Sequence, residues 1–440
     1  MGGVELPLVF HITRGADGSL TTTMDSPAQG AMGIPTSATR LEGDRLVIEV
    51  AAISGRFEGG FSEDGSAIEG VWSQGPNELP LTLTRGEPEK PARPQEPRPP
   101  FPYRVEDVRF ANDFAGIELA GTLTLPEGEG PFPAVVLISG SGPQDRDETL
   151  LGHKPFLVIA DHFTRRGIAV LRFDDRGVGE SEGSFATATS ADFATDAHAA
   201  VQYLARRPEI AADRIGLVGH SEGGLIAPMV AAHHDDVAFV VLMAGPGVPG
   251  SEILTEQGAR ILTANGVSQE LVESNRARQE RLFRVVREAP AEELAARIES
   301  ELRAEIEGMG PEERAVAGVT EDQLETVIRQ QVQQLSSPWF RYFLTYDPRE
   351  ALRRVTVPVL VVNGSLDLQV PADQNVPEIE AALREAGNHD VTVRVFEGLN
   401  HLFQPATTGS PNEYATIETT FSPEVLDVMA GWILERFGGR

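Results

Sequence analysis

Two serine-centred pentapeptides offer the chemistry of an activated hydroxyl. The pattern G-x-S-x-G occurs at 179–183 and again at 219–223. A nucleophile elbow needs this pattern between a buried strand and a helix, which cross closely at the serine. Only Ser221 has both, since an apolar run precedes it and a helical pattern with small residues follows, so we expect Ser221 to be the nucleophile. Ser181 follows the polar segment 174–178 and is predicted to be a loop residue.

A serine hydroxyl needs a general base, and the base needs a carboxylate that orients it. Asp367 and His401 each stand a few residues after a short, strand-like apolar run. In a parallel sheet the loops after such strands meet at one edge, with the acid before the histidine in the chain. We therefore expect Asp367 and His401 to complete a triad with Ser221, with Asp373 as the fallback acid.

The tetrahedral intermediate of acyl transfer needs two backbone N–H donors. One is expected from Glu222, the residue after the nucleophile. The other is expected from the Gly-rich segment 139–143, where Ser141 is favoured and Gly142 comes next. This segment matches neither a P-loop nor a dinucleotide fingerprint, so we expect no nucleotide cofactor.

Other histidines are assigned no catalytic role. His220 lies inside the elbow but in the wrong position to act as the base, and His198 belongs to a helical stripe. The run His-His-Asp-Asp at 233–236 has ligand chemistry, but consecutive residues at a helix end seldom converge on one ion. We expect no metal and no cofactor. The chain has no cysteine, which excludes disulfides, thiolate metal sites and cysteine nucleophiles.

The elements that must position these residues fall into several predicted regions. Period-two alternation and turn dipeptides predict a small antiparallel β domain over 1–86, and seven prolines predict an extended linker over 87–102. Apolar, β-branched runs then alternate with helical stripes over 103–246 and 347–440, which predicts a doubly wound, mostly parallel α/β sheet. Between them, 247–346 lacks strand signals and repeats apolar residues at helical spacing, so it is predicted to be a helical cap insertion.

An aromatic cluster ends the predicted cap, at Trp339, Phe340, Tyr342, Phe343 and Tyr346. Such a cluster serves either to pack the cap onto the sheet or to wall a substrate pocket. We favour packing, because aromatic side chains at helical spacing most often fill a core.

Charge excludes several classes of partner. With 37 Lys and Arg against 66 Asp and Glu, the formal net charge is −29, which repels phosphate backbones and anionic lipid surfaces. We therefore expect no nucleic-acid binding. No stretch approaches the ~20 apolar residues that span a bilayer, so we expect a soluble protein, either cytoplasmic or secreted or periplasmic with its signal peptide removed. A symmetric homodimer is the commonest oligomer of soluble enzymes, and we carry it as an expectation.

Taken together, these segments resemble the α/β-hydrolase superfamily over residues 103–440. The motifs that look like those of bacterial serine esterases are G-H-S-E-G-G at 219–224, R-G-V-G-E-S at 176–181, G-S-L-D at 364–367 and G-L-N-H at 398–401. The segment 139–147 is similar to that of a group of bacterial esterases with an N-terminal extension. It departs from the commoner His-Gly or His-Gly-Gly-Gly oxyanion loops. The resemblance implies an α/β-hydrolase fold and a carboxylic ester hydrolase acting on small molecules.

The implied reaction is a two-step acyl transfer through an acyl-enzyme. Two other activities on the same triad stay open, a peptidase or aminoacyl-cleaving enzyme and a thioesterase. A non-catalytic ligand-binding protein on a hydrolase fold is a further alternative, because fold does not imply function. An intact serine, aspartate and histidine in the expected order argue against it.

Overall fold

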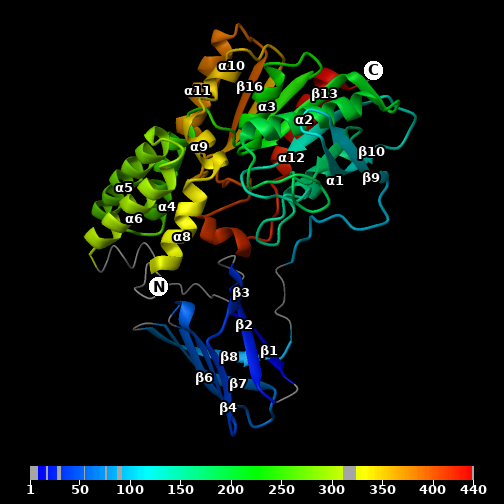
Figure 1. Ribbon diagram of the computed structural model, residues 1–440. Helices are drawn as coiled ribbons and strands as arrows, with labels where there is room; N and C mark the ends of the chain where they lie inside the picture. The colour runs from blue at the N-terminus through cyan, green and yellow to red at the C-terminus, as the bar shows by residue number, and fades with distance from the viewer. Residues whose placement is uncertain are drawn as a thin grey trace. The chain divides into compact units, whose positions relative to one another are not determined.

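Local sequence patterns explain most elements of the computed structural model shown in Figure 1. The structure describes residues 8–15, 18–26, 31–53, 55–74, 77–86, 92–310 and 324–438. Parts of every predicted region lie outside these residues, including 87–91 of the linker and 311–323 of the helical insertion. The chain divides into two units, Met1–Ala92 and Arg93–Arg440. Each unit is described below by itself.

The first unit is built only of antiparallel strands among its described residues, apart from one short 3-10 turn, Ala51–Ile53. The strands form two sheets, of order β1-β2-β3 and β4-β5-β6-β7-β8. Their bounds are β1 Val9–Arg14, β2 Leu20–Ser26, β3 Ala31–Pro35, β4 Ala38–Glu42, β5 Arg45–Val50, β6 Gly55–Phe61, β7 Ala67–Gln74 and β8 Asn77–Thr84. Alternation along β5 buries Leu46, Ile48 and Val50 against Phe57 and Trp72. The predicted all-β character of this region is confirmed.

The second unit contains one eight-stranded sheet of order β16-β15-β14-β13-β11-β12-β10-β9. Six neighbouring strands, β11 to β16, are parallel, and β9 and β10 are antiparallel at one edge. The bounds are β9 Arg104–Asn112, β10 Ile117–Leu125, β11 Phe132–Ile138, β12 Ala169–Phe173, β13 Ile210–His220, β14 Phe239–Met243, β15 Val359–Gly364 and β16 Val391–Phe396. The predicted mostly parallel sheet is confirmed. The edge strands β9 and β10 were not predicted.

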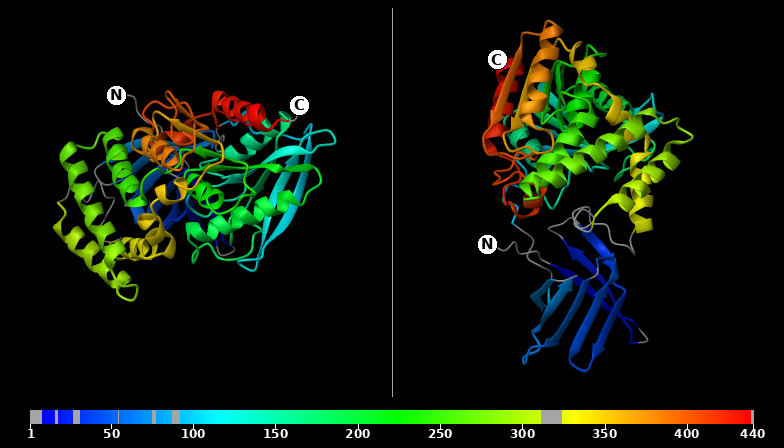
Figure 2. Two further views of the ribbon diagram at one scale, coloured as in Figure 1. Left: turned by 90° about the horizontal axis from the view of Figure 1, so that it is seen from above. Right: turned by 90° about the vertical axis from the view of Figure 1, so that its left-hand side faces the viewer.

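Helices cover both faces of this sheet, as a doubly wound fold requires. On one face α1 (Pro155–Arg165) and α12 (Pro423–Phe437) share a core with the strands. On the other face α2 (Ser190–Ala205), α3 (Gly223–Ala231) and α11 (Ala372–Glu385) do the same. α12, drawn in red in Figure 2, therefore lies on the face opposite to α2 and α3. Two short elements, α10 (Arg349–Leu352) and the 3-10 helix η3 (Pro411–Thr416), complete the unit.

A helical insertion separates β14 from β15. Its described helices are α4 Gly250–Ala264, α5 Gln269–Glu288, α6 Leu294–Gly308, α8 Leu324–Leu335 and α9 Pro338–Thr345. The four-residue repeat along α6 buries Leu294, Ile298 and Leu302 against Phe283 and Phe340. The insertion therefore has a core of its own, and Figure 1 shows α4, α5 and α6 grouped beside the sheet.

Residues 93–102, which composition assigns to the linker, belong to the second unit. Arg93 donates hydrogen bonds from its guanidinium to the carbonyls of Ile417 (2.7 Å) and Ala415 (2.9 Å). Gln95 donates to the carbonyl of Phe421 at 2.7 Å. These partners lie more than 300 residues away along the chain, so no local pattern could indicate them.

Candidate active site

Ser221 stands at a sharp strand-to-helix turn. It lies between the end of β13 and the start of α3, with a φ of +53° that non-glycine residues rarely adopt. Two glycines let the crossing backbones approach. A Cβ on Gly219 would lie 2.0 Å from the Gly223 carbonyl oxygen, and one on Gly223 would lie 2.1 Å from that of Ile138. This is the geometry of a nucleophile elbow.

His401 and Asp367, on the loops that follow β16 and β15, meet in the buried interior. His401 Nδ1 lies 2.8 Å from Asp367 Oδ2, and the two side chains are 6% and 0% exposed. The other carboxylate oxygen accepts hydrogen bonds from the backbone N–H groups of Gln369 (2.8 Å) and Val370 (2.9 Å). Because the carboxylate accepts at Nδ1, that nitrogen carries the proton and Nε2 is left free to take one.

The loop of His401 packs against the elbow. The His220 ring, next to Ser221 in the chain, lies 3.0 Å from the His401 carbonyl oxygen through Nε2, and the two ring centroids are 4.9 Å apart. The Ser221 side chain is half-buried. The fallback acid, Asp373, is exposed on α11 and pairs instead with Arg260 at 2.8 Å. The structure thus brings Asp367 to His401 and places Asp373 in a different contact.

The Gly-rich segment after β11 lies directly against the nucleophile. A Cβ on Gly140 would lie 3.2 Å from Ser221 Cβ. The Gly140 N–H donates to Glu148 Oε1 at 2.7 Å and is therefore already engaged. The backbone N–H groups of Ser141, Gly142 and Glu222 donate to no residue in the described part of the chain. All three stay available as the expected oxyanion donors, and the choice between Ser141 and Gly142 stays a prediction.

The Glu222 side chain makes contacts that the sequence did not indicate. It is buried, and its Oε1 accepts hydrogen bonds from Ser190 Oγ (2.6 Å) and from Trp339 Nε1 (2.7 Å). Burial raises the pKa of this carboxyl. Trp339 lies on α9 and stacks on Phe343 with ring centroids 5.3 Å apart. Trp339 and Phe343 therefore pack the helical insertion onto the sheet, and Trp339 touches the elbow itself. Two other members of the aromatic cluster, Tyr342 and Tyr346, line a cavity.

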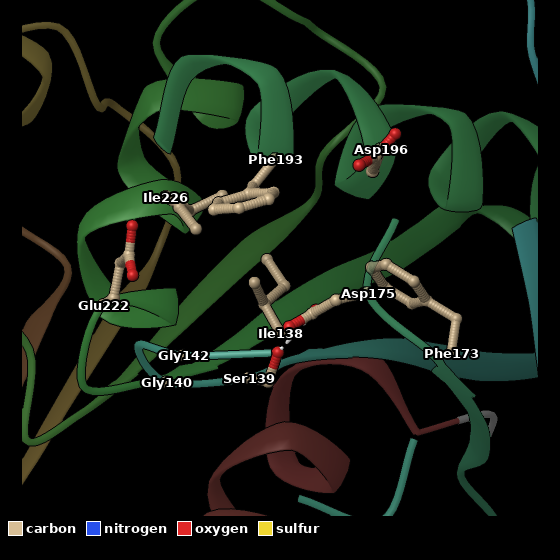
Figure 3. A pocket seen from close by; sticks show the side chains of 10 residues that line it. All are labelled: Ile138, Ser139, Gly140, Gly142, Phe173, Asp175, Phe193, Asp196, Glu222 and Ile226. Carbon is tan, nitrogen blue, oxygen red and sulfur yellow. Dashed lines mark hydrogen bonds between the residues drawn. The ribbon is translucent and has the colours of Figure 1, made fainter. Parts of the chain in front are cut away.

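A small cavity lies behind the Gly-rich segment, as Figure 3 shows. Its volume is about 10 Å³, room for about one water molecule and too small for a substrate. Asp175 points into it and accepts a hydrogen bond from Ser139 Oγ at 2.9 Å. Burial raises the pKa of Asp175 to about 8. The lining residues are Ile138, Ser139, Gly140, Gly142, Phe173, Asp175, Phe193, Asp196, Glu222 and Ile226.

The serine of the other pentapeptide, Ser181, holds its loop together through hydrogen bonds. Ser181 lies in a loop with its side chain buried, as a loop position was predicted. Its hydroxyl donates to the carbonyl of Asp174 at 2.7 Å and accepts from the backbone N–H of Ala120 at 2.9 Å. The Ser181 hydroxyl is thus engaged both as a donor and as an acceptor within the fold, and it is not free to attack a substrate.

Three side chains with metal-ligand chemistry meet away from the elbow. His198 on α2 contacts Asp236 at 3.1 Å and stacks on His234 with ring centroids 3.5 Å apart and planes 15° apart. The sequence analysis did not predict these contacts, because His198 lies on α2 whereas His234 and Asp236 lie on the loop after α3. An ion bound by an imidazole lies near the ring plane. Two nearly parallel planes this far apart cannot both contain one ion, so the arrangement does not fit a metal held by both rings.

A larger cavity of about 790 Å³ lies beside this cluster, between α2, α3, α9 and α10, and its lining includes none of the three predicted triad residues. Among the residues that the structure describes, no helix combines the length and apolar character needed to cross a bilayer.

Comparisons with known proteins identify a family and several similar proteins. A family described as X-Pro dipeptidyl-peptidase (S15 family) matches residues 115–401. Esterase EstD of Thermotoga maritima is 29% identical over 319 residues, which cover 72% of this chain and 66% of that esterase, just under two thirds of its length.

Two solved structures are similar to this chain over part of its length. An esterase of Pyrococcus furiosus is 17% identical, with a TM-score of 0.48 over 77% of this chain and 92% of its own. The α/β hydrolase GrgF of Penicillium is 18% identical, with a TM-score of 0.49 over 76% of this chain and 100% of its own. The expected α/β-hydrolase fold is confirmed by the strand order and the family match.

Proposed function

The chain belongs to the X-Pro dipeptidyl-peptidase (S15) family, and from this premise we propose that it is a serine hydrolase that cleaves carboxylic esters of small molecules. The observation that carries the proposal is the buried 2.8 Å contact between His401 and Asp367 beside the elbow of Ser221. The likeness to Esterase EstD favours an ester as the substrate.

The proposed reaction proceeds in two steps. Ser221 Oγ attacks the acyl carbon while His401 Nε2 takes its proton, and Asp367 stabilises the imidazolium that forms. The carbonyl oxygen becomes an oxyanion, which accepts hydrogen bonds from the N–H of Glu222 and from that of Ser141 or Gly142. His401 then gives its proton to the leaving alcohol, and a water molecule deprotonated by His401 cleaves the acyl-enzyme.

Two contributions account for the rate. General base catalysis is worth roughly 10²- to 10⁴-fold, and each oxyanion donor roughly 10²- to 10³-fold. Both depend on the relative placement of three loops, which follow β11, β13 and β16.

Labelling with a fluorophosphonate probe tests the proposal. Intact mass and peptide mapping are expected to give one adduct, on Ser221. An adduct on Ser181 would mean that the wrong pentapeptide was chosen. An unlabelled protein without ester turnover would contradict the proposal and favour a binding protein on a hydrolase fold.

A peptidase is the second candidate, because the matching family is described as an X-Pro dipeptidyl-peptidase. The same triad attacks an amide carbonyl, so the site geometry does not separate the two activities. Rates on an activated ester, an X-Pro anilide and an acyl-CoA do separate them. We expect the highest kcat/KM on the ester, and a higher value on the anilide would favour the peptidase.

We further propose that 103–246 and 347–440 form the catalytic domain and that 247–346 caps it. The symmetric dimer and the absence of nucleic-acid binding stay predictions, which sedimentation and a DNA-binding titration test.

A further inference from the structure

A second histidine–carboxylate pair lies directly beside the proposed triad. His220 Nδ1 is 2.9 Å from Glu148 Oε1, and both side chains are 5% exposed. His220 precedes the nucleophile in the chain, and Glu148 lies in the loop that begins with the Gly-rich segment. The proposed reaction uses neither side chain.

The hydrogen-bond partners of His220 determine how many protons it carries. Its Nε2 lies 3.0 Å from the carbonyl oxygen of His401, which can only accept, so Nε2 carries a proton. Its Nδ1 faces a carboxylate oxygen that already accepts from the Gly140 N–H at 2.7 Å. With a proton on Nδ1 as well, the pair is an imidazolium and a carboxylate, held together by charge and a hydrogen bond.

The direction of the pKa shift of His220 agrees with a doubly protonated ring. Burial alone would lower the pKa of His220, but the neighbouring Glu148 carboxylate and its hydrogen bond raise it overall. The charged or titratable groups that face the ring are Glu148 from the loop after β11, Asp367 from the loop after β15, and His401 from the loop after β16.

The pair joins the three segments on which the proposed chemistry depends. Glu148 holds the Gly140 N–H of the oxyanion segment, His220 is part of the elbow, and the ring of His220 holds the backbone of His401. A misplacement of the reacting groups by about 1 Å costs roughly 10²-fold in rate. Contacts that hold these three segments in place therefore contribute to catalysis.

The pair is not arranged for stability. Glu148 Oε2 is buried with no hydrogen-bond partner in the described part of the chain, which costs stability. The Glu148 backbone has a φ of +52°, which is strained for a residue with a side chain. Strain and an unpaired buried oxygen are tolerated where a site requires a particular geometry.

We propose that His220 and Glu148 form a positioning ion pair that aligns the oxyanion segment and His401 with Ser221. The inference rests on the function proposed above, because it assigns the pair a role in that reaction. His220 and Glu148 are positioning residues, since neither touches the reacting atoms.

His153 provides a matched control for His220. It too is fully buried, and its Nε2 donates to a backbone carbonyl, that of Tyr414, at 2.9 Å. Its Nδ1 accepts from the Thr420 hydroxyl at 3.0 Å instead of facing a carboxylate. Burial lowers the pKa of His153 to about 4, so this ring is neutral at pH 7.

Kinetics of Glu148→Gln, His220→Gln and His153→Gln on an activated ester give the first test. We expect the first two to lower kcat roughly 10- to 100-fold with KM changed less than about two-fold, because alignment acts on the transition state. Labelling by the fluorophosphonate should slow in parallel. His153→Gln should lower the melting temperature but leave kcat within about two-fold.

Nitrogen-15 NMR of histidine-labelled protein gives the second test, which does not depend on activity. We expect one imidazolium, protonated at both ring nitrogens, to persist above pH 6.5, the ordinary pKa of a histidine side chain. It should disappear in His220→Gln and lose its pH-resistant protonation in Glu148→Gln. This signature remains measurable in the wild type even if one variant fails to fold.

The outcomes separate this inference from the proposed function. An active, Ser221-labelled wild type with an unchanged kcat in folded Glu148→Gln and His220→Gln would overturn the ion pair's role alone. A His220 ring that loses its second proton at or below pH 6.5 would also overturn it. An inactive, unlabelled wild type would overturn the proposed function and this inference with it.

Discussion

The two serine pentapeptides have nearly the same letters and opposite surroundings. Ser181 is buried in a loop, where its hydroxyl donates to one backbone group and accepts from another. Ser221 is half-buried on a left-handed backbone between a strand and a helix. The pattern G-x-S-x-G therefore does not define a nucleophile. The elements before and after it do.

The glycines of the two pentapeptides also serve different contacts. A Cβ on Gly179 would lie 2.5 Å from the Asp174 carboxylate, so this glycine makes room for a side chain. In the elbow, Gly219 and Gly223 make room for crossing backbones. A carboxylate shapes the loop of Ser181, whereas a strand and a helix shape the turn of Ser221.

Removing each hydroxyl is the largest test of this contrast. We expect Ser221→Ala to lower ester turnover by about 10⁴-fold or more, because no other group can form the acyl-enzyme. Ser181→Ala should keep kcat within roughly two-fold, since its hydroxyl bonds only to backbone groups. Initial rates on an activated ester measure both. The contrast would be broken by an active Ser221→Ala.

The two candidate acids of the triad, Asp367 and Asp373, can be tested next. Asp367→Asn is expected to lower kcat by about 10³- to 10⁴-fold, because the amide no longer holds the proton on Nδ1 of His401. Asp373→Asn is the matched control and should stay within roughly two-fold, since Asp373 pairs with Arg260 on the surface. Equal losses in the two variants would contradict the assignment of Asp367.

The loop of Ser181 should depend on an ion pair for stability. Arg146 Nη2 lies 2.7 Å from the buried Asp174 carboxylate, and Arg146 Nε lies 3.0 Å from it. Arg146→Gln leaves this charge without its partner, so we expect a loss of about 3–5 kcal/mol in the free energy of unfolding. Arg165→Gln removes an exposed pair with Asp161 and should cost less than about 1 kcal/mol. Urea unfolding measures both.

The pH dependence of that loss has a definite sign. Burial alone would raise the pKa of Asp174, but the hydrogen bonds and charge of Arg146 lower it overall below 3.8. The ion pair therefore contributes fully above the unfolded pKa, and its contribution is lost as the pH falls below about 3.8. The difference between wild type and Arg146→Gln should shrink below that pH, and a constant difference would contradict the ion pair.

The smallest expected effect is on stability in Ser181→Ala. The substitution leaves the buried N–H of Ala120 without its acceptor, which costs about 1–3 kcal/mol. Thermal unfolding should show a lower melting temperature with a normal rate per folded molecule. An unchanged melting temperature would mean that the hydroxyl does not hold the loop.

Elements with a local pattern were predictable from the sequence. Apolar, β-branched runs within 103–246 and 347–440 indicated buried strands of a parallel sheet, and the structure places β14 (Phe239–Met243) and β15 (Val359–Gly364) there. The edge strand β9 was missed because its inward residues, such as Val108 and Phe110, alternate with exposed ones and form no continuous run. The order of Asp367 and His401 followed from the topology of a parallel sheet.

Contacts between distant segments were not predictable. Trp339 meets Glu222 across 117 residues, and His220 meets Glu148 across 72. Neither spacing has a period that a helix or strand would produce. Such meetings depend on how loops fold back over the sheet edge, and this is where sequence reasoning assigned His220 no role.

Because Trp339 donates a hydrogen bond to Glu222, the intrinsic fluorescence of this tryptophan can report the position of α9 relative to the elbow. The chain has three tryptophans, and the other two lie on β7 and α12. Indole emission depends on the partner of its N–H and on nearby water. A displacement of α9 from the elbow would break the 2.7 Å contact and shift the emission to longer wavelength. With Trp72 and Trp432 replaced by phenylalanine, fluorescence would follow the helical insertion during turnover without any attached dye.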